Sequence, residues 1–239
     1  MSSADIIDVI TAILTAMTVL FAFMAYRQSI EARRNSSFDA IFTQLLASFQ
    51  GLFSNDIVKK TRFKQVRLIV IGGESVSVKV MESQNVFLNF CNVYRYCFER
   101  KEKQFTVGEI CKIWKDFSNA LVYESDFLIC FKYVYHTIET ISSSELKDLD
   151  KKQYIGIVQA QLNLDVLFCY LINQIAVTNG KGNDFTKFLR SHNFFKNLYE
   201  DNDRYGNLAS ESIPSEVNAI FIDSKCEKVI RRRTCWSWF

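Results

Sequence analysis

The chain has 239 residues, of which 49% are hydrophobic and 23% are charged, and its formal net charge is +3. This balance excludes an intrinsically disordered chain, and the net charge is too small to indicate nucleic-acid binding by itself. Helix-breaking residues are scarce, with eight Gly and one Pro, and this scarcity favours long helices. The 21 Phe can supply an aromatic core.

Seven cysteines occur without a CxxC pair, and only two histidines accompany them. This spacing argues against a zinc site and against a disulfide framework. We therefore expect free thiols in a reducing compartment, and no metal or cofactor.

The most distinctive stretch is the run from Val9 to Tyr26, which contains no charged residue, Pro or Gly. A helix rising about 1.5 Å per residue over this run just covers the roughly 30 Å hydrocarbon layer of a membrane. The residues before the run are acidic, whereas a cleaved signal peptide would begin with basic ones. We predict an uncleaved single-pass anchor, with a buried core helix as the alternative. Basic residues follow the run, so the N-terminus is expected outside and residues 27–239 in the cytoplasm.

Small residues recur on one face of this span at spacings of four and three: Thr11, Thr15, Thr18, Ala22 and Ala25. Small side chains let two helices approach closely in lipid, and threonine hydroxyls can bond across the contact. The pattern indicates self-association of the span. The alternative is coincidence, because Ala and Thr are common in membrane helices.

The rest of the chain shows helical periodicity of apolar residues, so we predict an all-α fold. We expect one short β-hairpin near residues 67–80, where Gly-Gly precedes β-branched alternation; a loop followed by a helix fits this stretch as well. The predicted organisation is an anchor over 1–34, a cytoplasmic helical domain over 35–200, and a polar segment with a basic-aromatic tail over 201–239.

Several residues predict where helices begin and end. Ser36 or Ser37 can cap a helix that reaches about residue 54, and Thr106 with Glu109 forms a capping-box pattern. Asp148 or Asp150 is expected to open one long helix that runs to about Val177. Further helices are expected over 83–100, from Ser125, and over 184–198, with Gly180 and Gly182 as stop signals.

The sequence contains no recognisable hydrolase, nucleotide-loop or metal motif. A helical ribonuclease would need an Arg four to six residues before its His, and neither His136 nor His192 has one. The sequence therefore identifies no catalytic residue and no small-molecule substrate, which favours a non-enzymatic protein and leaves an enzyme without a recognisable motif as the alternative.

Four polar residues lie among the apolar residues of the predicted long helix: Gln159, Gln161, Asn163 and Asp165. Gln161 and Asp165 lie on its apolar side. Buried polar groups require hydrogen-bond partners. We expect Gln161 and Asp165 to join a structural network between helices, or to form a site for a ligand or partner.

The C-terminal tail combines three arginines with two tryptophans: Arg231, Arg232, Arg233, Trp236 and Trp238. Basic and aromatic residues together suit a membrane interface, and they also suit nucleic acid through phosphate contacts and stacking. The third interpretation is a tail that docks on its own domain.

Two segments resemble the AbiC-like family of phage abortive infection proteins. FDAIFTQLLASFQGLF, residues 38–53, is similar to the family's Phe- and Leu-rich opening helix. Residues 131–174, followed by FLRSHNFFKNL, are similar to its aromatic-basic helix and to its Arg-Ala-Gln-Leu helix with an acidic turn. The likeness covers about half of the part after the anchor.

The resemblance also marks individual positions. Lys132 stands where the family tends to have Arg, Gln159 to Leu162 stand for Arg-Ala-Gln-Leu, and Asp165 stands near a family Glu. Both basic positions depart from the pattern, as does the single predicted span, because members often carry two. The site of interest thus comprises Lys132, Gln159, Gln161 and Asp165.

The resemblance implies a membrane-bound helical effector that stops cell growth during infection. Our leading hypothesis is an anti-phage effector of the bacterial inner membrane whose anchors cluster and damage the membrane on release or assembly. Its expected partners are the lipid bilayer, further copies of itself, and a defence protein or nucleoprotein complex. The alternatives are a membrane-tethered nuclease without a recognisable motif and a scaffold that binds a nucleic-acid-containing complex.

Overall fold

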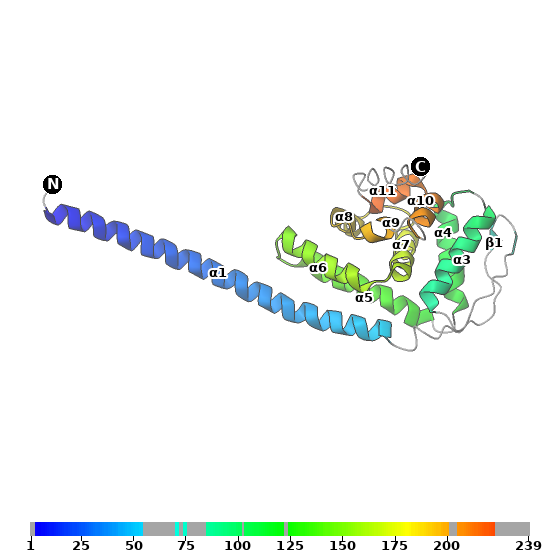
Figure 1. The fold of residues 1–239 in the computed structure, drawn as a ribbon, viewed down its shortest axis with the longest axis horizontal. Helices are drawn as coiled ribbons and strands as arrows, with labels where there is room; N and C mark the ends of the chain where they lie inside the picture. Colours follow the sequence, from blue (N-terminus) through cyan, green and yellow to red (C-terminus); the bar gives the residue numbers. More distant parts are fainter. Residues whose placement is uncertain are drawn as a thin grey trace, which may run out of the picture. The chain divides into compact units, whose positions relative to one another are not determined.

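The computed structural model describes residues 3–54, 70–71, 74–75, 85–101, 103–121, 124–200 and 205–222. Its elements in chain order are α1 (Ser3–Ser54), β1 (Val70–Ile71), β2 (Glu74–Ser75), α3 (Val86–Lys101), α4 (Val107–Ala120), α5 (Glu124–Ser143), α6 (Asp148–Gln161), α7 (Leu164–Thr178), α8 (Asp184–Ser191), α9 (Lys196–Glu200), α10 (Gly206–Ser212) and α11 (Ser215–Phe221). The predicted all-α class is confirmed (Figure 1).

A minimal antiparallel pair accompanies the helices. Residues of β1 and β2 pair with Val70 opposite Ser75 and Ile71 opposite Glu74. This pairing lies within residues 67–80, where the sequence predicted a short hairpin.

The contacts divide the chain into two units, Met1–Leu46 and Ala47–Phe239. The first unit contains most of α1, and the second contains the remaining elements.

The helix α1 runs without interruption from Ser3 to Ser54, so the predicted new start at Ser36 or Ser37 is wrong. The hydroxyl of Ser37 donates a hydrogen bond to the backbone carbonyl of Arg33, 2.9 Å away and one turn earlier. A serine that bonds back in this way remains inside the helix, where it does not cap a new one. Directly after Ser37, the rings of Phe38 and Phe42 stack with centroids 6.2 Å apart.

The core of the second unit is built around α7, shown in yellow-green in Figure 1. All ten of its residues from Val166 to Ile175 are buried, and α7 packs against α3, α4 and α9. A helix that is buried on every side is expected to be mostly apolar, and α7 is so except for the buried amides of Asn173 and Gln174.

Aromatic rings fill much of this core. Phe90 of α3 is fully buried, and its ring centroid lies 5.0 Å from that of Trp114 and 5.1 Å from that of Phe117, both on α4. Tyr94 packs edge-to-face on Phe168 of α7 at 5.2 Å. Edge-to-face geometry is the arrangement that the ring quadrupole favours, so these contacts stabilise the α3–α4–α7 packing beyond area burial alone.

The single long helix that we predicted from Asp148 to about Val177 is wrong. The structure divides it into α6 and α7, whose axes differ by 114°. Asn163 separates them with an extended backbone, and its side chain accepts a hydrogen bond from the amide of Val166 at 2.9 Å. Asparagine is a strong N-cap residue, and it starts a new helix here although the apolar periodicity continues through it.

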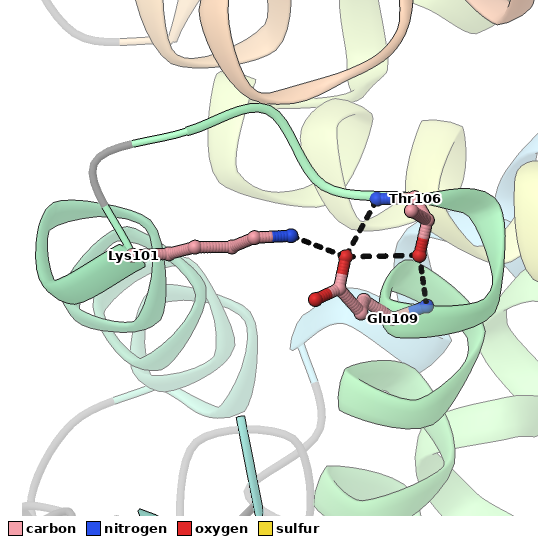
Figure 2. A network of polar contacts seen from close by, with 3 residues as sticks. All are labelled: Lys101, Thr106 and Glu109. Atoms are coloured by element: carbon pink, nitrogen blue, oxygen red, sulfur yellow. Dashed lines mark hydrogen bonds and ion pairs between the residues drawn. The ribbon is translucent and has the colours of Figure 1, made fainter. Parts of the chain in front are cut away.

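Other predicted boundaries are confirmed. Thr106 and Glu109 form the capping box at the start of α4, shown in Figure 2. At the end of α7, Asn179 and Gly180 both adopt positive φ, 51° and 67°, and the Gly180 amide bonds the carbonyl of Ile175 at 2.9 Å. This left-handed turn explains the stop signal.

The predicted helix over 184–198 is divided into α8 and α9. The helices α10 and α11 were not predicted, because the sequence becomes polar after Tyr199. They are nevertheless anchored by buried apolar residues, among them Ala209, Val217 and Phe221, and α11 packs on α8.

Candidate functional sites

Asp165, one of the predicted site residues, lies half-buried in the first turn of α7. Its carboxylate accepts a hydrogen bond from the hydroxyl of the buried Tyr205. Its backbone carbonyl accepts from the thiol of Cys91, on α3, at 3.6 Å. Asp165 therefore joins α7 to α3 and to the start of α10, which gives it a structural role.

Gln159 and Gln161 lie near the end of α6 and do not share this network. Gln161 is exposed, and its side-chain oxygen accepts a hydrogen bond from the amide of Gln50 at 2.9 Å. The amide nitrogen of Gln159 is buried without a partner among the described residues. Gln161 is thus exposed at the end of α6, whereas the periodicity of one continuous helix predicted it on the apolar side.

Lys132 lies on α5, exposed at the edge of a hollow of about 340 Å³ that we call the α5–α7 hollow. The other residues of α5 in this hollow are Leu128, Phe131 and Tyr135, and α7 contributes Asn173, Gln174 and Val177. These α7 residues belong to its C-terminal half, whereas Asp165 lies in its first turn. The structure thus places Lys132 in a different site from Asp165.

The α5–α7 hollow has mostly apolar walls, with two buried amides and one ammonium group. Lys132 forms no ion pair within the part of the chain that is described. Beside it, Tyr135 donates a hydrogen bond to Glu139 at 3.1 Å, and this bond raises the pKa of Tyr135. Two hydroxyls at the same helix pair, those of Thr137 and Tyr170, are buried without a described partner.

A second hollow, of about 370 Å³, lies among the end of α5, the start of α6 and the end of α8, and we call it the α6–α8 hollow. Lys151 and Lys152 of α6 and His192 after α8 line it. The sequence does not predict this hollow, because its residues come from three separate elements without a shared motif. His136 lies elsewhere, exposed and 3.4 Å from Glu139.

On α1, the described side chains from residue 17 to residue 30 include large apolar groups that are 42% to 65% exposed: Met17, Leu20, Phe21, Phe23, Met24, Tyr26 and Ile30. Successive residues of a helix are about 100° apart, so these side chains surround the helix. Of the predicted association face, Thr18, Ala22 and Ala25 are exposed. The side chains of Thr11 and Thr15 lie outside the described ones.

Within the described part of the chain, no single helix is both long and apolar enough to cross a membrane. The bent pair α6 and α7 meets that requirement when its two helices are taken together.

The five described cysteines are free thiols, as predicted from their spacing: Cys91, Cys97, Cys111, Cys130 and Cys169. Burial raises the pKa of Cys97 to about 12. A thiol with a raised pKa remains protonated at neutral pH and behaves as a small apolar side chain. The tail residues Arg231, Arg232, Arg233, Trp236 and Trp238 lie outside the described part of the chain.

A model of the family described as "putative phage abortive infection protein" matches residues 123–203. This match includes both hollows and the bend between α6 and α7, whereas residues 38–53 lie outside it. No curated protein and no solved structure matches the chain. The match confirms the predicted resemblance over residues 123–203, which are similar to the phage abortive infection proteins.

Proposed function

We propose that this protein is a membrane-anchored effector of phage abortive infection. In this proposal α1 crosses the bacterial inner membrane once, with the N-terminus outside and residues 27–239 in the cytoplasm. The family match supports the role in abortive infection. The character of α1 supports the anchor.

The observation that carries the anchor is the set of large apolar side chains around α1 that are exposed among its described residues 17–30. Residues 17–30 expose seven such side chains, and the uncharged run that contains most of them extends back to Val9. Exposing this much apolar surface to water is unfavourable by roughly 25 cal/mol per Å². A bilayer removes that cost, and the helical backbone satisfies its own polar groups there.

The proposed working step is clustering of anchors in the membrane, followed by membrane damage. The exposed face formed by Thr18, Ala22 and Ala25 supports close helix approach between copies. The helical unit would then hold the anchors apart or bring them together in response to a phage-linked signal, a defence partner or a nucleoprotein complex. The continuous backbone of α1 connects the anchor directly to residues of that unit.

Membrane extraction tests the anchor. The full chain and a form lacking residues 1–34 are expressed in bacteria, and their membranes are washed with alkaline carbonate. The full chain is expected to remain with the lipid, whereas the shortened form is expected in the soluble fraction. Release of the full chain by carbonate would contradict the anchor.

Self-association of the anchor is tested with two differently tagged copies. Ala22→Leu places bulk on the Thr18–Ala22–Ala25 face and is expected to reduce co-purification of the copies in detergent. Leu20→Phe is the matched control, since residue 20 lies about 200° around the helix from residue 18. Equal loss in both variants, or loss in neither, would contradict association through this face.

A further inference from the structure

Two lysines and a histidine converge on the α6–α8 hollow, which the proposed function does not use. Lys151 and Lys152 come from the second turn of α6, and His192 follows α8. These groups are separated by about forty residues of sequence and are brought together only by the fold.

Lys151 is held in place at the wall of this hollow. Its ammonium group donates a hydrogen bond to the backbone carbonyl of Ser142, near the end of α5, at 2.8 Å. An ammonium group has three N–H donors, so two remain for a ligand. The carbonyl contact reduces the motion of a side chain that would otherwise be flexible.

His192 is also oriented by the backbone. Its Nδ1 lies 2.9 Å from the carbonyl oxygen of Phe188 and 3.0 Å from the hydroxyl of Ser191. A carbonyl oxygen can only accept a hydrogen bond, so Nδ1 carries a proton in this arrangement. Nε2 is then the nitrogen left for a ligand: it accepts from a hydroxyl when the ring is neutral and donates to an anion when the ring is protonated.

The charge in the hollow is positive. Two lysines face one carboxylate, that of Asp148, which gives a net charge of +1 before His192 is counted. Lys152 is exposed and forms no ion pair among the described residues. Its charge is therefore not neutralised by any described acidic side chain.

We propose that the α6–α8 hollow binds a phosphate group, the chemical feature that free nucleotides share with a nucleic-acid strand. Ammonium groups form strong charge-assisted hydrogen bonds with phosphate, and they act as point charges that need no planar match. A planar carboxylate would be matched best by the fork of an arginine, and the described lining contains none. The volume of about 370 Å³ accommodates a phosphate with part of the molecule that carries it.

Calorimetric titration of the full chain in detergent tests this site with three probes: inorganic phosphate, adenosine monophosphate and a short single-stranded RNA. Lys152→Gln is expected to weaken phosphate binding roughly tenfold, because a charge-assisted hydrogen bond is lost. Lys152→Arg keeps the charge and is expected to stay within about threefold of the parent. Lys115→Gln is the matched control, an exposed lysine of α4 outside the hollow, and it is expected to leave binding unchanged.

The probes distinguish the source of the phosphate. Tighter binding of the RNA than of the mononucleotide identifies a nucleic-acid strand as the ligand, and the opposite order identifies a free nucleotide. Either order supports the proposed site, provided that Lys152→Gln weakens the binding. Absence of binding by all three probes at millimolar concentration would overturn the proposal. Equal binding by Lys152→Gln and the parent would also overturn it.

Discussion

The carboxylate of Asp165 at the start of α7 accepts a hydrogen bond from the hydroxyl of Tyr205, forty residues later in the chain. Tyr205 is 1% exposed and lies directly before α10. This pair therefore connects the central helix of the core to the C-terminal helices that the sequence did not predict.

Replacing Tyr205 by Phe removes this hydrogen bond and leaves the half-buried carboxylate with one partner fewer. We expect the free energy of unfolding to fall by about 1.5–3 kcal/mol, the usual value for a hydrogen bond to a charged group. Urea unfolding followed by circular dichroism measures it. Tyr133→Phe, at a half-buried position of α5, is the control and should change stability by less than about 0.5 kcal/mol. Equal stability of Tyr205→Phe and the parent would rule out this contribution.

The bend between α6 and α7 depends on Asn163 as an N-cap. Asn163→Ala removes the acceptor for the Val166 amide and should destabilise the protein by about 1 kcal/mol. Asn163→Asp keeps an acceptor at the same position and should be nearly neutral. Thermal unfolding of the two variants compares them directly. If Asn163→Asp lost as much stability as Asn163→Ala, the side-chain cap would not be what determines the start of α7.

The capping box at α4 predicts a pH dependence of stability (Figure 2). Burial of Glu109 opposes its ionisation, but hydrogen bonds from Lys101 and from the amide and hydroxyl of Thr106 outweigh this effect and lower the pKa of Glu109 below its ordinary 4.5. A lowered pKa means that the stabilisation is complete above the unfolded-state pKa and is lost as the pH falls through the folded-state pKa. We expect unfolding curves recorded from pH 6 downward to show this loss below about pH 4.5.

Glu109→Gln provides the test of that assignment. It cannot ionise, so its stability should depend less on pH over the same range, although it is less stable than the parent at neutral pH. Glu216→Gln is the control, since this exposed glutamate lies in the first turn of α11. A parent and a Glu109→Gln variant with parallel pH profiles would contradict the role of Glu109.

The largest loss of stability is expected from a substitution in the aromatic core. Phe90→Ala removes a fully buried ring that contacts Trp114 and Phe117, and it should cost about 3–5 kcal/mol of stability. Phe21→Ala is the control: it also removes a phenylalanine ring, but from a side chain of α1 that is 59% exposed. It should leave the unfolding of the helical unit unchanged. Denaturant titration of both variants checks the contrast. A small effect of Phe90→Ala would mean that this ring does not stabilise the packing of α3 on α4.

The sequence was informative where one residue type determines local geometry. Thr106 with Glu109 marked the start of α4, and Gly180 marked the end of α7, because a side-chain cap and a left-handed turn are local requirements. Ser37 looked equally like a cap, but its hydroxyl bonds inside α1. Asn163 was hidden by an apolar pattern that continues on both sides of it.

The candidate sites were harder to predict, since they depend on tertiary placement. Lys132 and Asp165 were grouped from a family pattern, yet Lys132 lies on α5 beside the C-terminal half of α7, whereas Asp165 lies in the first turn of α7. Lys151 and His192 line one hollow because α6 packs on α5 and the end of α8 reaches the same place. Periodicity along a single helix contains no information about that arrangement.

The central claim, that the anchor itself is the working part in abortive infection, is tested most directly by membrane potential during phage infection. Cells carrying the full chain are compared with cells carrying a chain whose residues 9–26 are replaced by an inert poly-leucine and alanine span. The account predicts that the full chain depolarises infected cells and limits phage yield, while the replaced span does neither although it remains membrane-bound. Full protection by a soluble form lacking residues 1–34, without depolarisation, would contradict it.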